Sequence, residues 1–194
     1  MAETILDQIV AMTQTDLAER KARVPLEELR AQAALAPESR LFTDALRPVA
    51  GSPARLIAEI KRASPSKGII AEIFDPVGQA QAYEYGGAAA ISVLTEPHYF
   101  QGSLEHLRTV REAVALPVLR KDFIFDPYQV YEARIARADA LLLIVALLDD
   151  ALLRELLAVT RELGMEALVE AHDASEVRRA VTAGASVIGV NSRD

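Results

Sequence analysis

Residues 140–171 read ALLLIVALLDDALLRELLAVTRELGMEALVEA and contain one complete strand–helix–strand unit. The apolar runs 140–145 and 167–169 are typical of strands that are covered on both faces. Between them, an amphipathic segment over 151–163 has acidic capping residues before it and Gly164 after it, which predicts a helix. Two buried strands joined by one helix predict a parallel pair with a crossover connection.

The same unit recurs from residue 55 to the end of the sequence, where short apolar runs alternate with capped helical segments. The six apolar runs are 56–60, 89–94, 117–119, 140–145, 167–169 and 186–190. The helices between them are predicted to begin at Asp75-Pro76, Ser103, Asp126-Pro127, Asp149 or Asp150, and Asp173 or Ser175. This alternation predicts an α/β protein with a parallel sheet.

The number of predicted strands bears on the architecture. A closed eight-stranded α/β barrel takes about 250 residues, whereas this sequence has 194. An open six-stranded sheet and a shortened barrel are both compatible with that length. The strand at 186–190 runs into Asn191 with no helix after it, which favours a (β/α)8-barrel fold whose strands seven and eight are missing. We therefore expect a single domain, with barrel strands one to six over 55–194 and a helical extension over 1–54 packed on them.

Composition narrows the classes of function. Hydrophobic residues make up 51% of the chain and charged residues 25%, as in folded globular domains. The net charge of −7 argues against nucleic acid as a partner, because phosphate backbones need a basic face. The longest apolar run, 140–148, is too short to cross a membrane. With no cysteine and three histidines without paired ligand spacing, we expect no metal site and a cytoplasmic protein.

Polar side chains stand near the C-terminal ends of four predicted strands. They are Glu59 and Lys61 on the first strand, Lys121 on the third, Glu170 on the fifth and Asn191 after the sixth. Since α/β barrels build their active sites at this end of the sheet, the pattern predicts one shared site. A lysine there can serve as a general acid, but a neighbouring glutamate would oppose any lowering of its pKa. The sequence leaves open which lysine lies beside which glutamate.

Five segments resemble signatures of the indole-3-glycerol phosphate synthase family, in the family's order and spacing and over essentially the whole chain. They are IAEIKRASPSKG (57–68), SVLTEPHYFQGS (92–103), LRKDF (119–123), LVEAH (168–172) and GVNSRD (189–194). The resemblance implies a (β/α)8 barrel with extra N-terminal helices. It also implies conversion of 1-(o-carboxyphenylamino)-1-deoxyribulose 5-phosphate, with loss of carbon dioxide and water, to indole-3-glycerol phosphate in tryptophan biosynthesis. No metal or organic cofactor is implied.

The resemblance also implies roles for the strand-end residues. Lys121 would be the general acid that protonates the ribulose carbonyl during ring closure, and Glu170 would be the base of the dehydration step. Glu59 and Lys61 would lie at the reacting centre, with their shares of the dehydration left open. Asn191 would hold a substrate hydroxyl or an orienting hydrogen bond. The implied substrate-binding residues are Ser64 and Pro65 in the first loop, Phe100 and Phe123 beside the anthranilate ring, Leu142 below it, and Arg193 beside Asn191.

The sequence departs from the family pattern in one respect, and two other functions are compatible with it. The strand-seven and strand-eight segments that would supply most of the phosphate site are absent, so we expect weak or no turnover by the 194-residue chain. We expect the complete protein to be a monomer and this chain to be able to self-associate. The alternatives are a phosphate-binding barrel lyase that forms a Schiff base through Lys61 or Lys121, and an inactive fragment that needs its missing C-terminal third.

Overall fold

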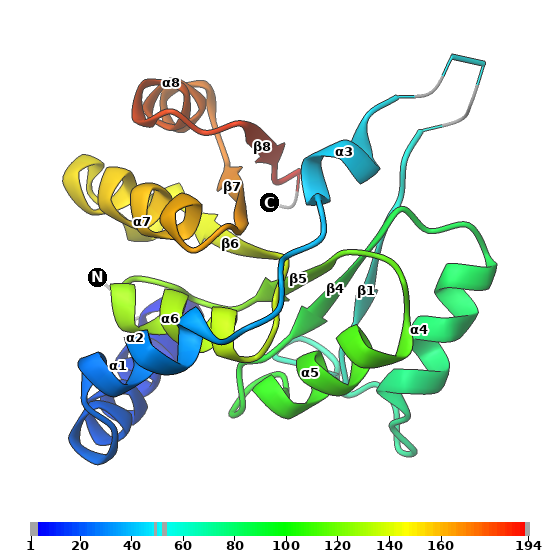
Figure 1. Ribbon diagram of the computed structural model, residues 1–194, viewed down its shortest axis with the longest axis horizontal. Coiled ribbons are helices and arrows are strands. Elements are labelled where there is room, and N and C mark those ends of the chain that lie inside the picture. The colour runs from blue at the N-terminus through cyan, green and yellow to red at the C-terminus, as the bar shows by residue number, and fades with distance from the viewer. Residues whose placement is uncertain (1–3, 49, 52–53, 193–194) are drawn as a thin grey trace.

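The computed structural model describes residues 4–48, 50–51 and 54–192, and it contains a six-stranded, all-parallel sheet. The strands are β1 (Ile57–Ile60), β4 (Ala90–Leu94), β5 (Val118–Lys121), β6 (Ala140–Ile144), β7 (Glu166–Ala171) and β8 (Val187–Val190), adjacent in this order. The sheet curves into a half-barrel (Figure 1). All six predicted strands are therefore confirmed, and the fold is that of a TIM-barrel-like α/β protein.

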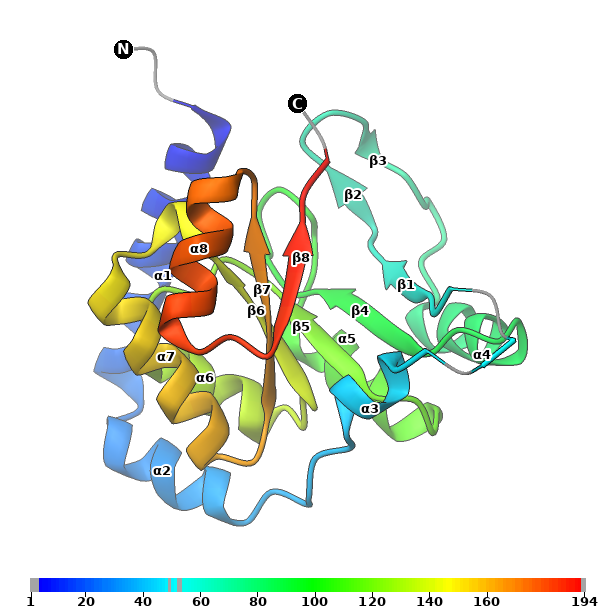
Figure 2. The same cartoon turned by 90° about the horizontal axis from the view of Figure 1, so that it is seen from above.

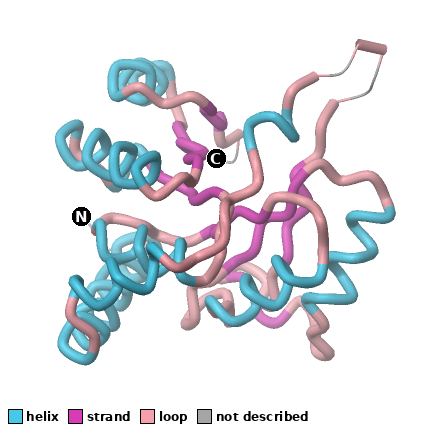
Figure 3. The backbone as a smooth tube through the Cα atoms, viewed as in Figure 1, coloured by secondary structure: helices cyan, strands magenta, loops and turns pink. Residues whose placement is uncertain are grey.

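Five helices follow the strands along the chain and cover the convex face of the sheet (Figure 3). They are α4 (Pro76–Tyr85), α5 (Leu104–Ala113), α6 (Pro127–Ile135), α7 (Asp150–Glu162) and α8 (Ala174–Ala183). Each begins after a residue whose side chain accepts a hydrogen bond from a backbone N–H of the first turn: Asp75, Ser103, Asp126, Asp149 and Asp173. Where two capping residues were possible, the structure selects Asp149 and Asp173.

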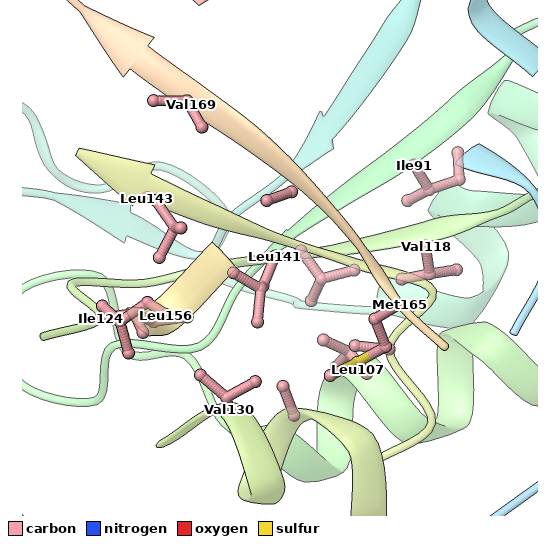
Figure 4. Packing of buried hydrophobic residues seen from close by; sticks show 14 of the residues in the cluster. Ile91, Leu107, Val118, Ile124, Val130, Leu141, Leu143, Leu156, Met165 and Val169 are labelled. Atoms are coloured by element: carbon pink, nitrogen blue, oxygen red, sulfur yellow. The ribbon is translucent and has the colours of Figure 1, made fainter. Parts of the chain in front are cut away.

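The main core lies between the sheet and these helices. It includes Ile91, Val118, Leu141 and Leu143 from the strands, packed against helix residues such as Leu156, and all of these are fully buried (Figure 4). These strand side chains point outward, and they are apolar because helices cover this face of the sheet. The inner set on the same strands is left to form the concave face.

Three helices precede the sheet. Helices α1 (Ile5–Arg23) and α2 (Leu26–Ala34) pack against α6, where Leu17, Leu29 and Tyr128 form a small buried cluster. The short helix α3 (Phe42–Leu46) lies inside the curve of the sheet, at the end where the strands begin (Figure 2). Its Phe42 is completely buried and packs against Ala90, Leu119 and Ala140 of the inner face.

The loop after β1 contains regular structure of its own. It contains a two-residue antiparallel hairpin, β2 (Ala63–Ser64) with β3 (Gly68–Ile69), and Gly68 has a φ of 62°. A short 3₁₀ helix, η1 (Val145–Leu147), follows β6, so this strand ends at Ile144, one residue earlier than predicted. The described helices include none that is both long and apolar enough to cross a membrane.

Candidate active site

Two adjoining cavities open at the C-terminal ends of the strands, with volumes of about 250 and 280 Å³. They share Lys121, Glu170 and Asn191. The first is also lined by Leu6, Leu94, Phe100, Asp122, Phe123, Leu142, Ile144 and His172, and the second by Leu168, Gly189, Val190 and Ser192. Six of the predicted site residues therefore line connected space at the predicted end of the sheet: Lys121, Glu170, Asn191, Phe100, Phe123 and Leu142.

Glu59 lies between the two predicted lysines. One carboxylate oxygen, Oε1, accepts a hydrogen bond of 2.5 Å from the Lys61 ammonium, and the other, Oε2, is 3.0 Å from the Lys121 Nζ atom. Burial acts to raise the pKa of Glu59, but the hydrogen bond from Lys61 and the charge of Lys121 together outweigh it and lower this pKa below its ordinary value. The question that the sequence left open is thus answered: both lysines contact the same glutamate, which stays ionised.

Glu170 has different neighbours. The Asn191 side-chain amide donates a hydrogen bond of 3.1 Å to the Glu170 carboxylate, and the Asn191 backbone N–H donates to the carbonyl of Ala171. The His172 Nε2 atom lies 3.7 Å from the same carboxylate, while its Nδ1 atom is 3.2 Å from Glu176. The carboxyl group of Glu170 is therefore flanked by an amide and an imidazole rather than by an ammonium group.

An apolar wall bounds the first cavity. The rings of Phe100 and Phe123 are 6.3 Å apart between centroids and are tilted by 38°. Leu142 and Ile144 project from β6 beside them, and Leu6 of α1 completes the lining. A flat apolar group can lie against these side chains while its polar substituents reach Lys121 and Glu170, which is the usual composition of a small-molecule site.

Three predicted binding residues stand apart from the two cavities. Ser64 and Pro65 lie in and next to the β2–β3 hairpin, and neither lines the described cavity walls. Pro65 is exposed. Arg193 lies outside the residues that the structure describes. Their roles stay predictions. Within the described chain there is no group of three His, Cys, Asp or Glu side chains arranged to hold a metal ion.

A family model for indole-3-glycerol phosphate synthase matches residues 6–194. The chain belongs to the indole-3-glycerol phosphate synthase family. It is accordingly an enzyme, a carboxy-lyase of tryptophan biosynthesis. The cavity at the strand ends is the candidate active site of this synthase.

Relatives named indole-3-glycerol phosphate synthase match along almost the entire chain. The sequence is 53% identical to the one from Roseiflexus sp. (strain RS-1) over 198 residues, which covers 99% of this chain and 73% of the relative. It is 54% identical to the one from Mycolicibacterium smegmatis over 192 residues, covering 98% of this chain and 69% of the relative. Identity at this level, over almost the whole chain, shows that the chain belongs to the same family.

Solved structures support the fold alone. A mandelate oxidase bound to benzoyl-formic acid superposes with a TM-score of 0.51 at 18% identity, over 68% of this chain and 48% of its own. Pyruvate carboxylase from Rhizobium etli superposes with a TM-score of 0.53 at 18% identity, over 72% of this chain and 16% of its own. These likenesses place the synthase chain among TIM-barrel-like α/β folds.

Several residues in or next to the synthase site were not predicted from the sequence. Leu6 reaches the cavity from the first helix, far away in the sequence, and no local pattern marked it. His172 follows Glu170 by two residues, so the alternation of side chains along β7 and just beyond it could have identified it. Glu96, directly after β4, is completely buried beside the aromatic wall and was also passed over.

Proposed function

We propose that this protein closes the pyrrole ring of indole-3-glycerol phosphate, using 1-(o-carboxyphenylamino)-1-deoxyribulose 5-phosphate as substrate. The observation that carries the proposal is the contact of two ammonium groups with Glu59, one of which, that of Lys121, lines a cavity together with Glu170 and an aromatic wall. Proton donors, a carboxylate base and an apolar surface for a benzene ring are the groups that this reaction requires.

Ring closure would use Lys121 as the proton donor. The aromatic carbon that carries the carboxylate attacks the ribulose carbonyl carbon, a carbon–carbon bond forms, and the carbonyl oxygen takes a proton from Lys121. The ammonium group of Lys121 lies 3.0 Å from the Glu59 carboxylate, and the ammonium form of a lysine is the one able to donate a proton. Loss of carbon dioxide then returns the bonding electrons to the ring and restores its aromaticity.

Dehydration would use Glu170 as the base. Glu170 removes a proton from the carbon next to the nitrogen, and the hydroxyl group leaves as water after taking a proton from an ammonium group held at Glu59. Two protons are donated and one is recovered, so each turnover takes up one proton, as the loss of a carboxylate as carbon dioxide demands. Asn191, which donates to Glu170, would orient this carboxylate.

Substrate binding would divide between the two sides of the site. Phe100, Phe123 and Leu142 would border the anthranilate ring. Lys61 and Ser64 would meet the anionic groups, Pro65 would be a further substrate-binding residue of the same loop, and Arg193 would support Asn191. We further propose that the protein is cytoplasmic, that residues 1–54 belong to the same domain as the strands, and that the complete protein is a monomer whereas this chain can self-associate. A sedimentation coefficient of this chain that rises with concentration would agree with self-association.

A Schiff-base mechanism has less support. An ammonium ion lacks the lone pair that attacks a carbonyl, and the Lys61 and Lys121 ammonium groups both form ion pairs with Glu59. Borohydride treatment in the presence of the substrate separates the two mechanisms. We expect no covalent adduct on either lysine.

The proposal is tested by indole fluorescence after mixing the substrate with the protein in excess, so that even one slow turnover is detected. The chain has no tryptophan, so its own background at these wavelengths is low. We expect a rise in fluorescence that Lys121→Met abolishes and that Lys21→Met, on the exposed surface of α1, leaves unchanged. An equal rise in Lys121→Met, or no rise both with this chain and with one extended past Asp194, would overturn it.

A further inference from the structure

Glu96 is a completely buried carboxylate at the end of β4. A buried carboxylate is unfavourable unless ionic or hydrogen-bonding partners replace the water that it loses. None of the ion pairs found among residues 4–48, 50–51 and 54–192 involves Glu96. Its partners are therefore of another kind.

The partners are backbone N–H groups of the loop that follows. The Oε1 atom of Glu96 accepts from the N–H of His98 at 2.9 Å, and the Oε2 atom accepts from those of Tyr99 at 2.7 Å and Phe100 at 3.0 Å. The backbone carbonyl of Glu96 accepts from the N–H of Gly102 at 2.8 Å. One residue thus orders the whole turn, through hydrogen bonds that are strengthened by the charge.

The turn is also constrained at its far side. Gln101 has a φ of 51°, a left-handed conformation that is unfavourable for a residue with a side chain. At Gly102 a Cβ atom would lie 2.3 Å from the carbonyl oxygen of Leu94, so only glycine allows this close approach. Such a strained conformation persists only where surrounding contacts enforce it, and the bonds to Glu96 are those contacts.

The residue that this turn carries into the cavity is Phe100. Its N–H is held by Glu96, and its carbonyl accepts from the N–H of Ala63 at 3.2 Å, in the loop after β1. With both of its backbone polar groups bonded, the Phe100 ring is held at 6.3 Å from that of Phe123. The side chain of Glu96 does not itself line either cavity.

We propose that Glu96 is a positioning residue of the active site, which acts through Phe100 to fix the aromatic wall against which the substrate's benzene ring lies. This inference rests on the proposed function of the site. Ring closure needs the attacking aromatic carbon to be aimed at the carbonyl carbon, and small misplacements reduce such rates strongly. Loss of Glu96 should therefore reduce kcat/KM, with part of the loss in kcat.

The test compares Glu96→Gln with Asp139→Asn. Gln keeps the size of Glu96 but turns one acceptor oxygen into a donor, so at least one of the three bonds is lost. Asp139 is a matched control because it is also completely buried and also accepts from two backbone N–H groups, those of Arg40 and Val118, at the other end of the sheet. We expect kcat/KM to fall about 10–100-fold in Glu96→Gln and to stay within about twofold in Asp139→Asn, although both lower Tm.

A double-mutant cycle with Phe100→Ala distinguishes positioning from general destabilisation. If Glu96 acts through Phe100, Glu96→Gln lowers kcat/KM by less than about twofold in the Phe100→Ala background while its effect on Tm persists. A full effect in that background, or a kcat/KM for Glu96→Gln as high as that of Asp139→Asn, overturns the proposal.

Hydrogen exchange tests the same contacts without using activity. We expect the amides of His98, Tyr99 and Phe100 to exchange at least about tenfold faster in Glu96→Gln, and those of Arg40 and Val118 to respond only in Asp139→Asn. Unchanged exchange at residues 98–100 overturns the positioning role whatever the activity. Faster exchange in Glu96→Gln would show that Glu96 orders the loop even if the parent protein forms no indole-3-glycerol phosphate. That second result would overturn the proposed function, and with it the role of Glu96 toward substrate.

Discussion

The two ends of the parallel sheet use their charged side chains differently. At the end where the strands begin, Asp139 is completely buried and accepts hydrogen bonds from the backbone of Arg40 and Val118 and from the guanidinium of Arg111, all within 2.8 Å. There the fully buried Phe42 ring covers the inner face. At this end the buried carboxylate of Asp139 thus holds two backbone N–H groups and one guanidinium group in place.

At the end where the strands finish, the charges face open space. Lys61 and Glu59 are about a quarter exposed and Lys121 is 36% exposed, and Lys121 and Glu170 line the same cavity. Strand β7 carries the contrast within a single face: Glu166, at its start, accepts from the Thr43 N–H of α3 at 2.8 Å, whereas Glu170 faces the cavity. Identical side chains on one strand thus lie in a packing contact at one end and at the proposed site of the base at the other.

The largest expected effect is that of Glu170→Gln on the rate. Removal of the base should lower kcat by about 10³-fold, equivalent to about 4 kcal/mol of activation free energy, and should leave Tm nearly unchanged. Single-turnover kinetics and thermal unfolding measure the two quantities. Glu166→Gln is the matched control from the same face of β7, and it should keep kcat within about twofold. A similar loss of kcat in both variants would contradict the division between the two ends.

The next effect concerns stability. Asp139→Ala leaves Arg111 without its carboxylate and two buried backbone N–H groups without an acceptor, so it should lower the free energy of unfolding by about 3 kcal/mol. Urea unfolding measures this loss. For comparison, Asp149→Ala removes only the exposed cap of α7 and should lower the same free energy by about 1 kcal/mol. Equal losses of unfolding free energy in the two variants would mean that the buried contacts of Asp139 stabilise the fold no more than an exposed helix cap does.

A smaller effect appears in the pH dependence of stability. The pKa of Glu59 is lower in the folded protein than its ordinary value of 4.5, so the ionised carboxylate stabilises the fold above that pH. This stabilisation is lost as the pH falls from 4.5 through the folded-state pKa. The decrease in Tm between about pH 6 and about pH 3.5 should therefore be smaller in Glu59→Gln than in the parent. An equal or larger decrease would mean that the two lysines do not stabilise the ionised form.

The smallest effect is expected away from both ends. Arg23 pairs with Glu19 on the surface of α1, with exposed fractions of 75% and 62% for the two side chains. Because water screens such a pair, Arg23→Ala should change the free energy of unfolding by less than about 0.5 kcal/mol and leave kcat unaltered. Urea unfolding and the fluorescence assay test this, and a loss near that of Asp139→Ala would remove the contrast between buried and exposed charge.

Local patterns in the sequence were enough to predict the six strands of the parallel sheet and the five helices between them, but not the β2–β3 hairpin or η1. Apolar runs mark the strands, and Asp or Ser before each helix marks its start, because a cap bonds to N–H groups only two or three residues away. Alternation along each strand likewise placed Lys121 and Glu170 at the same end of the sheet. These predictions needed only interactions between near neighbours in the chain, or a rule common to all parallel α/β sheets.

Contacts between distant segments decided the rest. Glu59 meets Lys121, which is 62 positions away, because β1 and β5 curve around the same opening. Phe42 covers the start of the inner face, and Leu6 reaches the cavity, although neither follows a strand pattern. Glu96 looks like any loop carboxylate in the sequence, and only the folded turn brings three N–H groups to it. Side-chain partners across the sheet depend on its curvature and on how the helices pack, which no local periodicity encodes.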